Sequence, residues 1–482
     1  MAIKIHKMIL NTGIYTMGNF LPQAIGFILL PIYTKFLTPA QYGIIGSMQV
    51  LQYFFALLFT LSLEKSVIRL YWNYEDEEDR KSFLGTLNIV VILTAVFFSA
   101  IFYLLHKYVN LIFLSIPFYP YYLYAILNSL FIAISVIPLN YLILKEKPRV
   151  YFYITTFQLV LSTSLILYFV VIQRQEAEGL MLGKMLASMI IIPAFIYIAK
   201  KGFSYKFNMR ALKDAAAFSF PIIPTMIISW VLNQSDRIMI EKYFSLASVG
   251  IYALSRQISN LIALLSTAFA MAYGPIFFRL VNSNEKDKEN NINKIYKINN
   301  LFISIMMLIF FTVSLICKDL ILLFLNHRYY EAYYFIPIIS FAYFVNSITA
   351  VILGYYFQQS KRMKENMYIA LVVSLFYIGL SLPFIKYLGL LGASLLLIIS
   401  SISIFTASYI YTKKHCFFIN FDWKSNITVL ILFIMTIILF VYLISQTSLI
   451  LFGLKLLIII FYVITLLKRQ IKLSTVFQYS SI

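Results

Sequence analysis

The chain has 482 residues, of which 61% are hydrophobic, and its mean hydropathy is +0.85. A soluble domain cannot bury that much apolar surface, so the composition excludes a soluble protein and indicates one whose solvent is lipid. The formal net charge of +20 does not indicate a nucleic-acid partner. Most of the 39 Lys and Arg fall on alternate connections between apolar stretches, where they encode membrane orientation.

Apolar stretches of about twenty residues follow one another along almost the whole chain, and each is long enough to cross a bilayer as a helix. The sequence therefore predicts an all-α polytopic membrane protein with about 14 transmembrane helices. The expected spans are 11–34, 42–63, 83–105, 119–144, 152–172, 179–199, 218–240, 248–278, 298–325, 332–357, 366–384, 390–411, 427–445 and 448–467.

The basic connections fix the orientation of these helices. Clusters such as Lys200, Lys201, Lys206 and Arg210 lie on the side where the chain begins, and Lys and Arg are enriched on the cytoplasmic side of membrane proteins. An even number of spans returns the chain to that side. We therefore expect both termini to be cytoplasmic and the first helix to be retained instead of cleaved as a signal peptide.

Two pairs of segments recur at nearly the same spacing. An offset of 207 aligns KFLTPAQYGI, from Lys35, with KYFSLASVGI, from Lys242, and an offset of 213 aligns residues 179–201 with 392–414. The order of the two matches indicates an internal repeat of six helices. Because six is even, both copies share one orientation, and an axis along the membrane normal would relate them.

The repeat predicts the domain organisation. Residues 1–200 form an N-terminal lobe of helices 1–6, and 201–217 form a cytoplasmic amphipathic linker. Residues 218–414 form a C-terminal lobe of helices 7–12, and 415–482 hold helices 13 and 14 with a cytoplasmic tail. For the linker, an ordinary solvated loop is the alternative.

Polar side chains within the spans are the first candidates for function, because ionisable groups are costly in a bilayer and usually face water or one another. Three helices carry such side chains at intervals of three or four residues, on one face of each helix. These stripes are Asn233, Asp236 and Arg237; Arg256, Asn260 and Thr267; and Tyr15, Asn19 and Gln23. We expect them to line a cavity, although a tie between helices explains the Asp236 and Arg237 pair equally well.

Charged side chains at the inner ends of two spans form a candidate gate. Glu64, Lys65 and Arg69 end the second span, and Arg279 ends the eighth. The alternative for Lys65, Arg69 and Arg279 is that each simply reaches the lipid headgroups. Asp236 or Glu64 would titrate if transport is coupled to protons, while sodium coupling and no coupling stay open.

The sequence predicts no catalytic residues, no metal site and no cofactor. The four His are scattered among termini and loops, and no His and carboxylate cluster accompanies them. A cationic, polar cavity suits an anionic phosphate or pyrophosphate group, because Arg presents paired donors to phosphate oxygens.

Three segments carry a family resemblance. They are NTGIYTMGNFLPQAIGFILLPIYTKFLTPAQYGIIG at 11–46, LKDAAAFSFPIIPTMIISWVLNQSDRIMI at 212–240 and VGIYALSRQI at 249–258. The chain resembles the bacterial oligosaccharide flippases of Wzx type. These belong with the multidrug and toxin exporters in one superfamily of two six-helix lobes, often with two further C-terminal helices. The resemblance extends over essentially the whole chain.

The resemblance implies a flippase of the bacterial cytoplasmic membrane and not an enzyme. Its cargo would be polyprenyl-pyrophosphate-linked oligosaccharide repeat units, moved from the inner to the outer leaflet by alternating access for surface polysaccharide synthesis. It also implies that basic residues line a central cavity, and the matching positions are Arg69, Arg237, Arg256 and Arg279. Glycosyltransferases and a polysaccharide polymerase are the implied partners.

Other functions stay open at this stage. A peptidoglycan-precursor flippase or a drug and cation antiporter would share the fold. A membrane glycosyltransferase or polymerase would need catalytic groups in sizeable external loops, whereas the external connections here are short.

Overall fold

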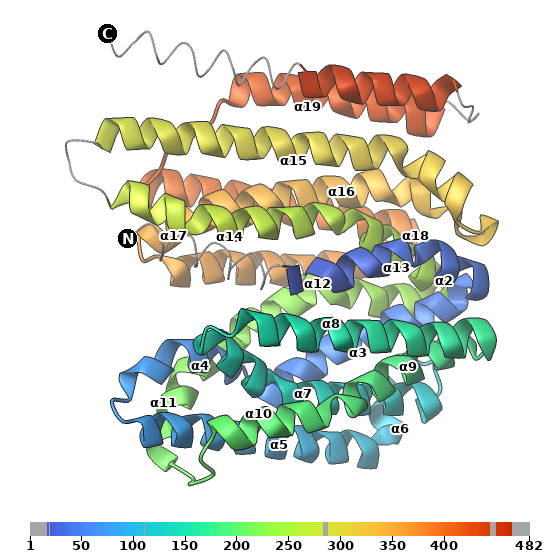
Figure 1. Cartoon of the computed structure of the whole chain (residues 1–482). Helices are drawn as coiled ribbons and strands as arrows, with labels where there is room; N and C mark the ends of the chain where they lie inside the picture. The colour runs from blue at the N-terminus through green and yellow to red at the C-terminus, as the bar shows by residue number, and fades with distance from the viewer. Residues whose placement is uncertain (1–16, 19, 110, 283–287, 444–449, 465–482) are drawn as a thin grey trace. The chain divides into compact units, whose positions relative to one another are not determined.

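The structure is a computed structural model that describes residues 17–18, 20–109, 111–282, 288–443 and 450–464. The chain divides into two compact units, Met1–Ala253 and Leu254–Ile482. Figure 1 traces both, and each is described by itself. The expected lobe boundaries at 200, 217 and 414 stay a prediction.

All regular structure in the described residues is helical, which confirms the all-α prediction. Among the residues that the structure describes, ten helical segments are long and apolar enough to cross a membrane, and two shorter apolar helices, Ile427–Val441 and Ile450–Ile464, follow. The chain is thus a multi-pass membrane protein with about ten to twelve apolar helices. The ten are Pro39–Thr60, Glu77–Leu104, Phe118–Leu144, Pro148–Ile172, Glu176–Gly202, Met209–Tyr243, Leu246–Val281, Lys288–Phe324, Ala332–Gln359 and Met363–His415.

Two expected spans, 366–384 and 390–411, lie in the single segment α18 (Met363–His415). They are separated at Gly389, whose φ of 58° breaks the helical path and is accessible to glycine without strain. The first expected span, 11–34, lies partly outside the described residues, within which residues 20–28 and α2 (Leu30–Phe36) are helical. The number of 14 spans therefore stays a prediction.

The first unit contains the helices from α2 to the first half of α13. Thr38 starts α3 with a capping box, in which its hydroxyl accepts from Gln41 N and its own N–H donates to the Gln41 side chain. The further helices are α3 (Pro39–Thr60), α4 (Glu64–Leu70), α5 (Glu77–Leu104), α6 (His106–Val109), α7 (Leu123–Leu144), α8 (Pro148–Leu167), α9 (Glu176–Ile190), α10 (Ile192–Gly202), α11 (Met209–Ser219), α12 (Ile223–Tyr243) and α13 (Leu246–Ser259).

The second unit contains the rest of α13 and five long helices. They are α14 (Leu261–Val281), α15 (Lys288–Phe324), α16 (Ala332–Ile348), α18 and α19 (Trp423–Ile437). The short α17 (Gly354–Gln359) lies between α16 and α18, the wide helical turn η8 (Ile438–Leu443) follows α19, and Ile450–Ile464 is the last described helix.

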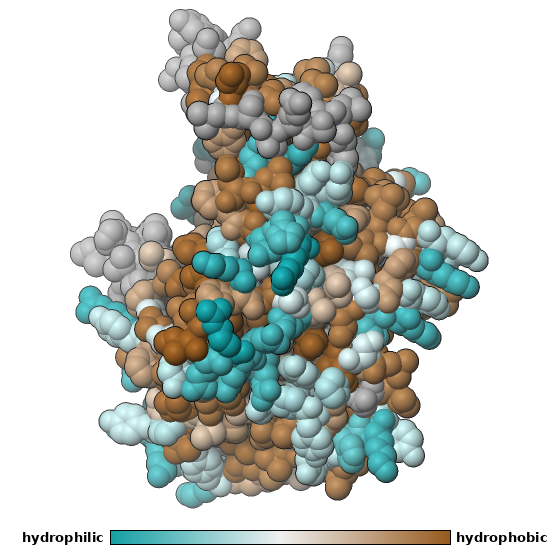
Figure 2. All heavy atoms as spheres, turned by 90° about the vertical axis from the view of Figure 1, so that its right-hand side faces the viewer, coloured by the Kyte–Doolittle hydropathy of each residue, from teal (hydrophilic) through white to brown (hydrophobic). Residues whose placement is uncertain are grey.

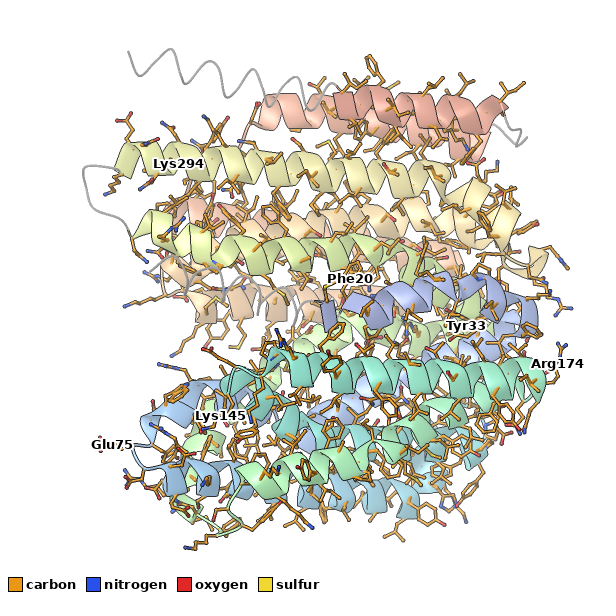
Figure 3. All side chains as sticks on the ribbon, viewed as in Figure 1. Phe20, Tyr33, Glu75, Lys145, Arg174 and Lys294 are labelled. Atoms are coloured by element: carbon orange, nitrogen blue, oxygen red, sulfur yellow. The ribbon has the colours of Figure 1, made fainter. Side chains whose placement is uncertain are left out.

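Labelled side chains mark the two ends of the first unit in Figure 3. Glu75 and Lys145 lie at one end of this unit, whereas Arg174 lies at the other (Figure 3). Figure 2 faces the end with Arg174 and shows hydrophilic side chains among hydrophobic ones there.

The expected linker region is helical only in part. After α10, residues 203–208 run without helical structure along the start of α5, where Ser204 N donates to Lys81 O and Ser82 Oγ donates to Lys206 O. A Cβ at Gly85 would lie 1.9 Å from Ser204 O, so glycine is needed for this approach. The amphipathic helix α11 follows, which means that the region is docked on its own unit.

The repeat is visible in the structure as a reciprocal contact. A Cβ at Gly43 in α3 would lie 1.9 Å from Leu246 O, and a Cβ at Gly250 in α13 would lie 1.9 Å from Pro39 O. Gly43 and Gly250 are aligned by the offset of 207. The two copies of the repeated segment thus meet each other through equivalent residues, as a local twofold relation requires.

Adding a methyl group at this contact tests its importance. Gly43→Ala and Gly250→Ala should each destabilise the protein by more than about 2 kcal/mol, because backbone atoms cannot move aside as a side chain can. Gly379→Ala is the matched control, since its Cβ would meet nothing within 4 Å. Thermal unfolding in detergent measures the difference, and equal stability of all three variants would refute the close approach.

A buried ion pair connects the last described helix to α15 in the second unit. Lys455 Nζ lies 2.6 Å from Asp319 Oδ2, and both side chains are under 5% exposed. The neighbouring Lys318 donates to Val441 O of η8 at 3.5 Å, and its ammonium lies 5.2 Å from the centre of the Tyr333 ring. These bonds join both helices of the C-terminal pair to adjacent residues of α15.

Removing one partner of this pair should be far worse than removing both. Lys455→Met leaves the Asp319 carboxylate buried beside an apolar group, and loss of a buried partner typically costs about 3–5 kcal/mol. The double variant Asp319→Leu with Lys455→Met removes the uncompensated charge and should regain most of that stability. Thermal unfolding of both variants checks this, and a double variant as unstable as the single one would contradict it.

Candidate functional site

One stripe of α3 carries polar side chains that are accessible in the middle of the span. Gln49 and Tyr53 are exposed, Gln52 is half-exposed and Ala56 is exposed. Gln49 Nε2 lies 3.5 Å from Tyr53 OH. Side chains at these intervals share one helical face, and a face toward lipid would be apolar. The stripe therefore indicates contact with water.

The helix α12 lies beside α3 in the same unit. Trp230 Nε1 donates to Val50 O at 3.0 Å, and Arg237 Nη1 donates to Gly46 O at 3.0 Å. The rings of Phe54 and Trp230 are 5.2 Å apart. Because residue numbers rise along one helix as they fall along the other, α3 and α12 run antiparallel.

Accessible polar groups also follow one side of α12. Thr225 and Ser229 are exposed, and Asn233 is half-exposed with its Nδ2 donating to Ser229 O at 2.8 Å. Each residue advances about 100° around a helix. On each helix the polar stripe is displaced around the axis from the residues that contact the other helix. Because the two helices run antiparallel, these displacements place both stripes on the same side of the helix pair. We name Gln49, Gln52, Tyr53, Ser229 and Asn233 the α3–α12 patch.

The chemistry of the α3–α12 patch suits a carbohydrate. Its amides and hydroxyls both donate and accept hydrogen bonds, as sugar hydroxyls do. Tyr53 adds an aromatic face and a polar tip, and the half-exposed Trp230 lies between the two stripes. No charged side chain belongs to the patch as defined, so it would recognise the neutral part of a cargo.

Asp236 and Arg237 make contacts inside the protein. Asp236 is fully buried, and Tyr252 OH donates to its Oδ2 at 2.5 Å. Arg237 is also buried and donates to Gly46 O. These bonds join α12 to α13 and to α3, as the helix-tie interpretation expects. Substrate contact by either residue stays a prediction.

Arg256 is 4% exposed within the second unit. Its Nη2 donates to Tyr343 OH of α16 at 3.2 Å, and its neighbour Ser255 donates to Ala332 O. Asn260, which precedes α14, is half-exposed, and Thr267 is exposed. Arg256 thus lies on the packed side of α13, with the polar positions of its stripe becoming accessible farther along.

Three of the expected gate residues occupy a short helix after a break, namely Glu64, Lys65 and Arg69. Leu61 and Ser62 have positive φ angles of 48° and 56°, so α3 ends there and α4 starts on a new path with Glu64. Lys65 and Arg69 are exposed, and Lys65 Nζ lies 3.9 Å from Glu64 Oε1. The sequence predicts the charges but not the break, because neither Leu nor Ser favours this backbone region.

Two further predicted residues are placed separately. Arg279 is exposed in the last turn of α14, and Gln23 is exposed on the helical residues 20–28. Asn19 lies outside the described residues. Gln49, Gln52, Tyr53 and Ser229 are absent from the predicted set, although the spacing of Gln49, Gln52 and Tyr53 within one span is a signal that could have identified them.

Comparison with solved structures identifies the fold. The chain is similar to the lipid II flippase MurJ in an inward closed conformation, with a TM-score of 0.73, 15% identity and coverage of 97% of this chain and 99% of that chain. It is also similar to an inward-facing multidrug resistance MATE family transporter of the MOP superfamily, with a TM-score of 0.58, 13% identity and coverage of 83% and 94%. The chain therefore shares the fold of these two proteins.

The family follows from the sequence comparison. The profile of the polysaccharide biosynthesis protein family matches residues 9–281, more than half of the chain, and the chain belongs to this family. The MatE profile matches residues 221–382. Protein 1 of the Lsg locus of Haemophilus influenzae is 23% identical over 423 residues, which cover 85% of this chain and 98% of that protein. The chain is therefore a MATE-like membrane protein of the polysaccharide biosynthesis family.

Proposed function

We propose that the chain is a flippase that moves polyprenyl-pyrophosphate-linked oligosaccharide repeat units from the inner to the outer leaflet of the cytoplasmic membrane by alternating access. The observation that carries this proposal is the α3–α12 patch, a carbohydrate-compatible surface in the middle of a membrane span. The family supports a polysaccharide cargo, and the fold is shared with a protein described as a lipid II flippase.

The oligosaccharide and the lipid need different surroundings. The sugar residues would exchange water for the amides and hydroxyls of the patch, while the polyprenyl tail stays in the bilayer, because burying its chain in a polar path costs free energy. Lys65 and Arg69, exposed on α4, would attract the pyrophosphate at the cytoplasmic entrance. The completed repeat unit would come from glycosyltransferases on the inner side and go to a polymerase on the outer side.

Glu64 is the candidate for ion coupling. Its Oε2 is buried and has no hydrogen-bond partner among the described residues, while its Oε1 is 3.9 Å from Lys65 Nζ. A buried carboxylate oxygen without a donor leaves an acceptor open to a cation. Binding there would neutralise a charge next to the break between α3 and α4, which is a natural point for a conformational change.

Substitutions in the α3–α12 patch test the proposed function. Gln49→Ala with Asn233→Ala should lower the rate of translocation of a lipid-linked oligosaccharide in proteoliposomes by about tenfold or more, because two buried hydrogen bonds to the cargo contribute roughly 1–3 kcal/mol together. Gln173→Ala, an exposed amide beyond the end of α8, is the matched control and should translocate normally.

The measurement uses protein whose folding is confirmed by thermal unfolding, so that loss of transport is not loss of structure. Full translocation by the double variant would remove the patch from the path. Absence of translocation by the unaltered protein, with the same cargo and both ion gradients applied, would refute the proposed function itself.

A further inference from the structure

Lys184 is a cation within a membrane span that none of the contacts above explains. It lies on α9, two turns after the first residue, Glu176, or about 12 Å along the helix axis. That depth is comparable with the position of Gln49 on α3, which starts at the same side of the membrane in the predicted orientation. Lysine at such a depth is costly and usually functional.

Its position on α9 is unusual because the rest of its face is buried. Ala177, Leu180, Ala187 and Ser188 are neighbours of Lys184 around and along the helix, and all four are buried. Lys184 itself is exposed. The side chain thus starts from the packed face of the helix and still reaches accessible space.

The lipid side of α9 is elsewhere. Leu182 and Leu186 lie two residues before and after Lys184, on the opposite side of the helix, and both are half-exposed apolar side chains. A lysine that faced lipid would belong to that side. The exposure of Lys184 therefore lies on the packed side of α9, away from the accessible apolar side of the helix.

Two neighbouring helices flank this face. A Cβ at Gly183 would lie 2.8 Å from Ile166 N, which shows how closely α8 approaches on one side. On the other side Ser188 Oγ donates to Asn128 Oδ1 of α7 at 2.8 Å. Lys184 lies between these two contacts, in the first unit and independent of the second.

The Lys184 ammonium has no hydrogen bond or ion pair among the described residues. An ammonium group offers three donors and a full positive charge, and hydrocarbon satisfies neither. Water or an anionic ligand must therefore be its partner. The buried ion pair of Lys455 shows how this protein otherwise accommodates a lysine at membrane depth.

We propose that Lys184 lines a water-accessible hollow of the first unit and binds the phosphate or pyrophosphate group of the cargo. The inference rests on the proposed function and adds a residue to it. Lysine binds phosphate as a compact point charge. The amides of the α3–α12 patch at a comparable depth would hold the sugars while Lys184 holds the anion.

Accessibility is tested without any transport. In a protein with Cys317→Ser and Cys416→Ser, Lys184→Cys is treated with a charged, membrane-impermeant thiol reagent in vesicles of both orientations. It should react at least about ten times faster than Leu186→Cys, its partner on the lipid side, in one orientation. Equal, negligible rates for both in both orientations would overturn the hollow.

Anion binding is tested on the unaltered protein. Inorganic pyrophosphate at millimolar concentration should slow labelling of Lys184 by a water-soluble amine reagent severalfold, while Lys201, at the end of α10, keeps its rate. Labelling of Lys184 that is unaffected by pyrophosphate would overturn the phosphate assignment. Mass spectrometry of the two peptides gives both rates.

Translocation supplies the last readout. Lys184→Ala should lower the rate of flipping of the lipid-linked oligosaccharide by about tenfold, and Lys184→Arg should keep most of it. An unchanged rate for Lys184→Ala would show that the ammonium only reaches lipid headgroups, and the inference would fail. If the unaltered protein itself moves no such cargo, the proposed function fails, whereas the two labelling experiments still decide what Lys184 contacts.

Discussion

Hydrocarbon cannot form hydrogen bonds, and this constraint sorts every polar side chain within the spans into one of two groups. Some are bonded within the protein, such as the Asp319 and Lys455 pair and the Asp236 carboxylate that accepts from Tyr252. Others are accessible although they also lie within a span, as on α3. An accessible polar side chain within a span must contact water. Such side chains therefore indicate a transport path.

The sequence predicts much of the fold because span length and apolar character depend on the bilayer alone. It also predicts the repeat, and the reciprocal approach of Gly43 and Gly250 shows that the matched glycines have a common cause, namely close packing of equivalent backbones. The break at Leu61 and Ser62 could not be predicted, since its backbone angles are imposed by the surrounding packing and not by the residues that adopt them.

The candidate site was only partly predictable for a related reason. Charge alone selects Asp236, Arg237 and Arg256, but charge does not distinguish a bonded, buried group from an accessible one. The structure buries all three, while the neutral Gln49 and Tyr53 are accessible. Neutral amides attract less attention in a sequence, yet they suit a sugar, and the family is one of polysaccharide biosynthesis.

The central claim is that one face of α3 meets water in the middle of the membrane. Replacing each residue from Gln49 to Ala56 in turn by Cys, in the background without native cysteines, and measuring the reaction rate with a charged thiol reagent tests it directly. The account predicts maxima at 49, 52, 53 and 56 and minima at 50, 51 and 55. Uniformly negligible rates along the whole segment, or maxima at 50, 51 and 55, would contradict it.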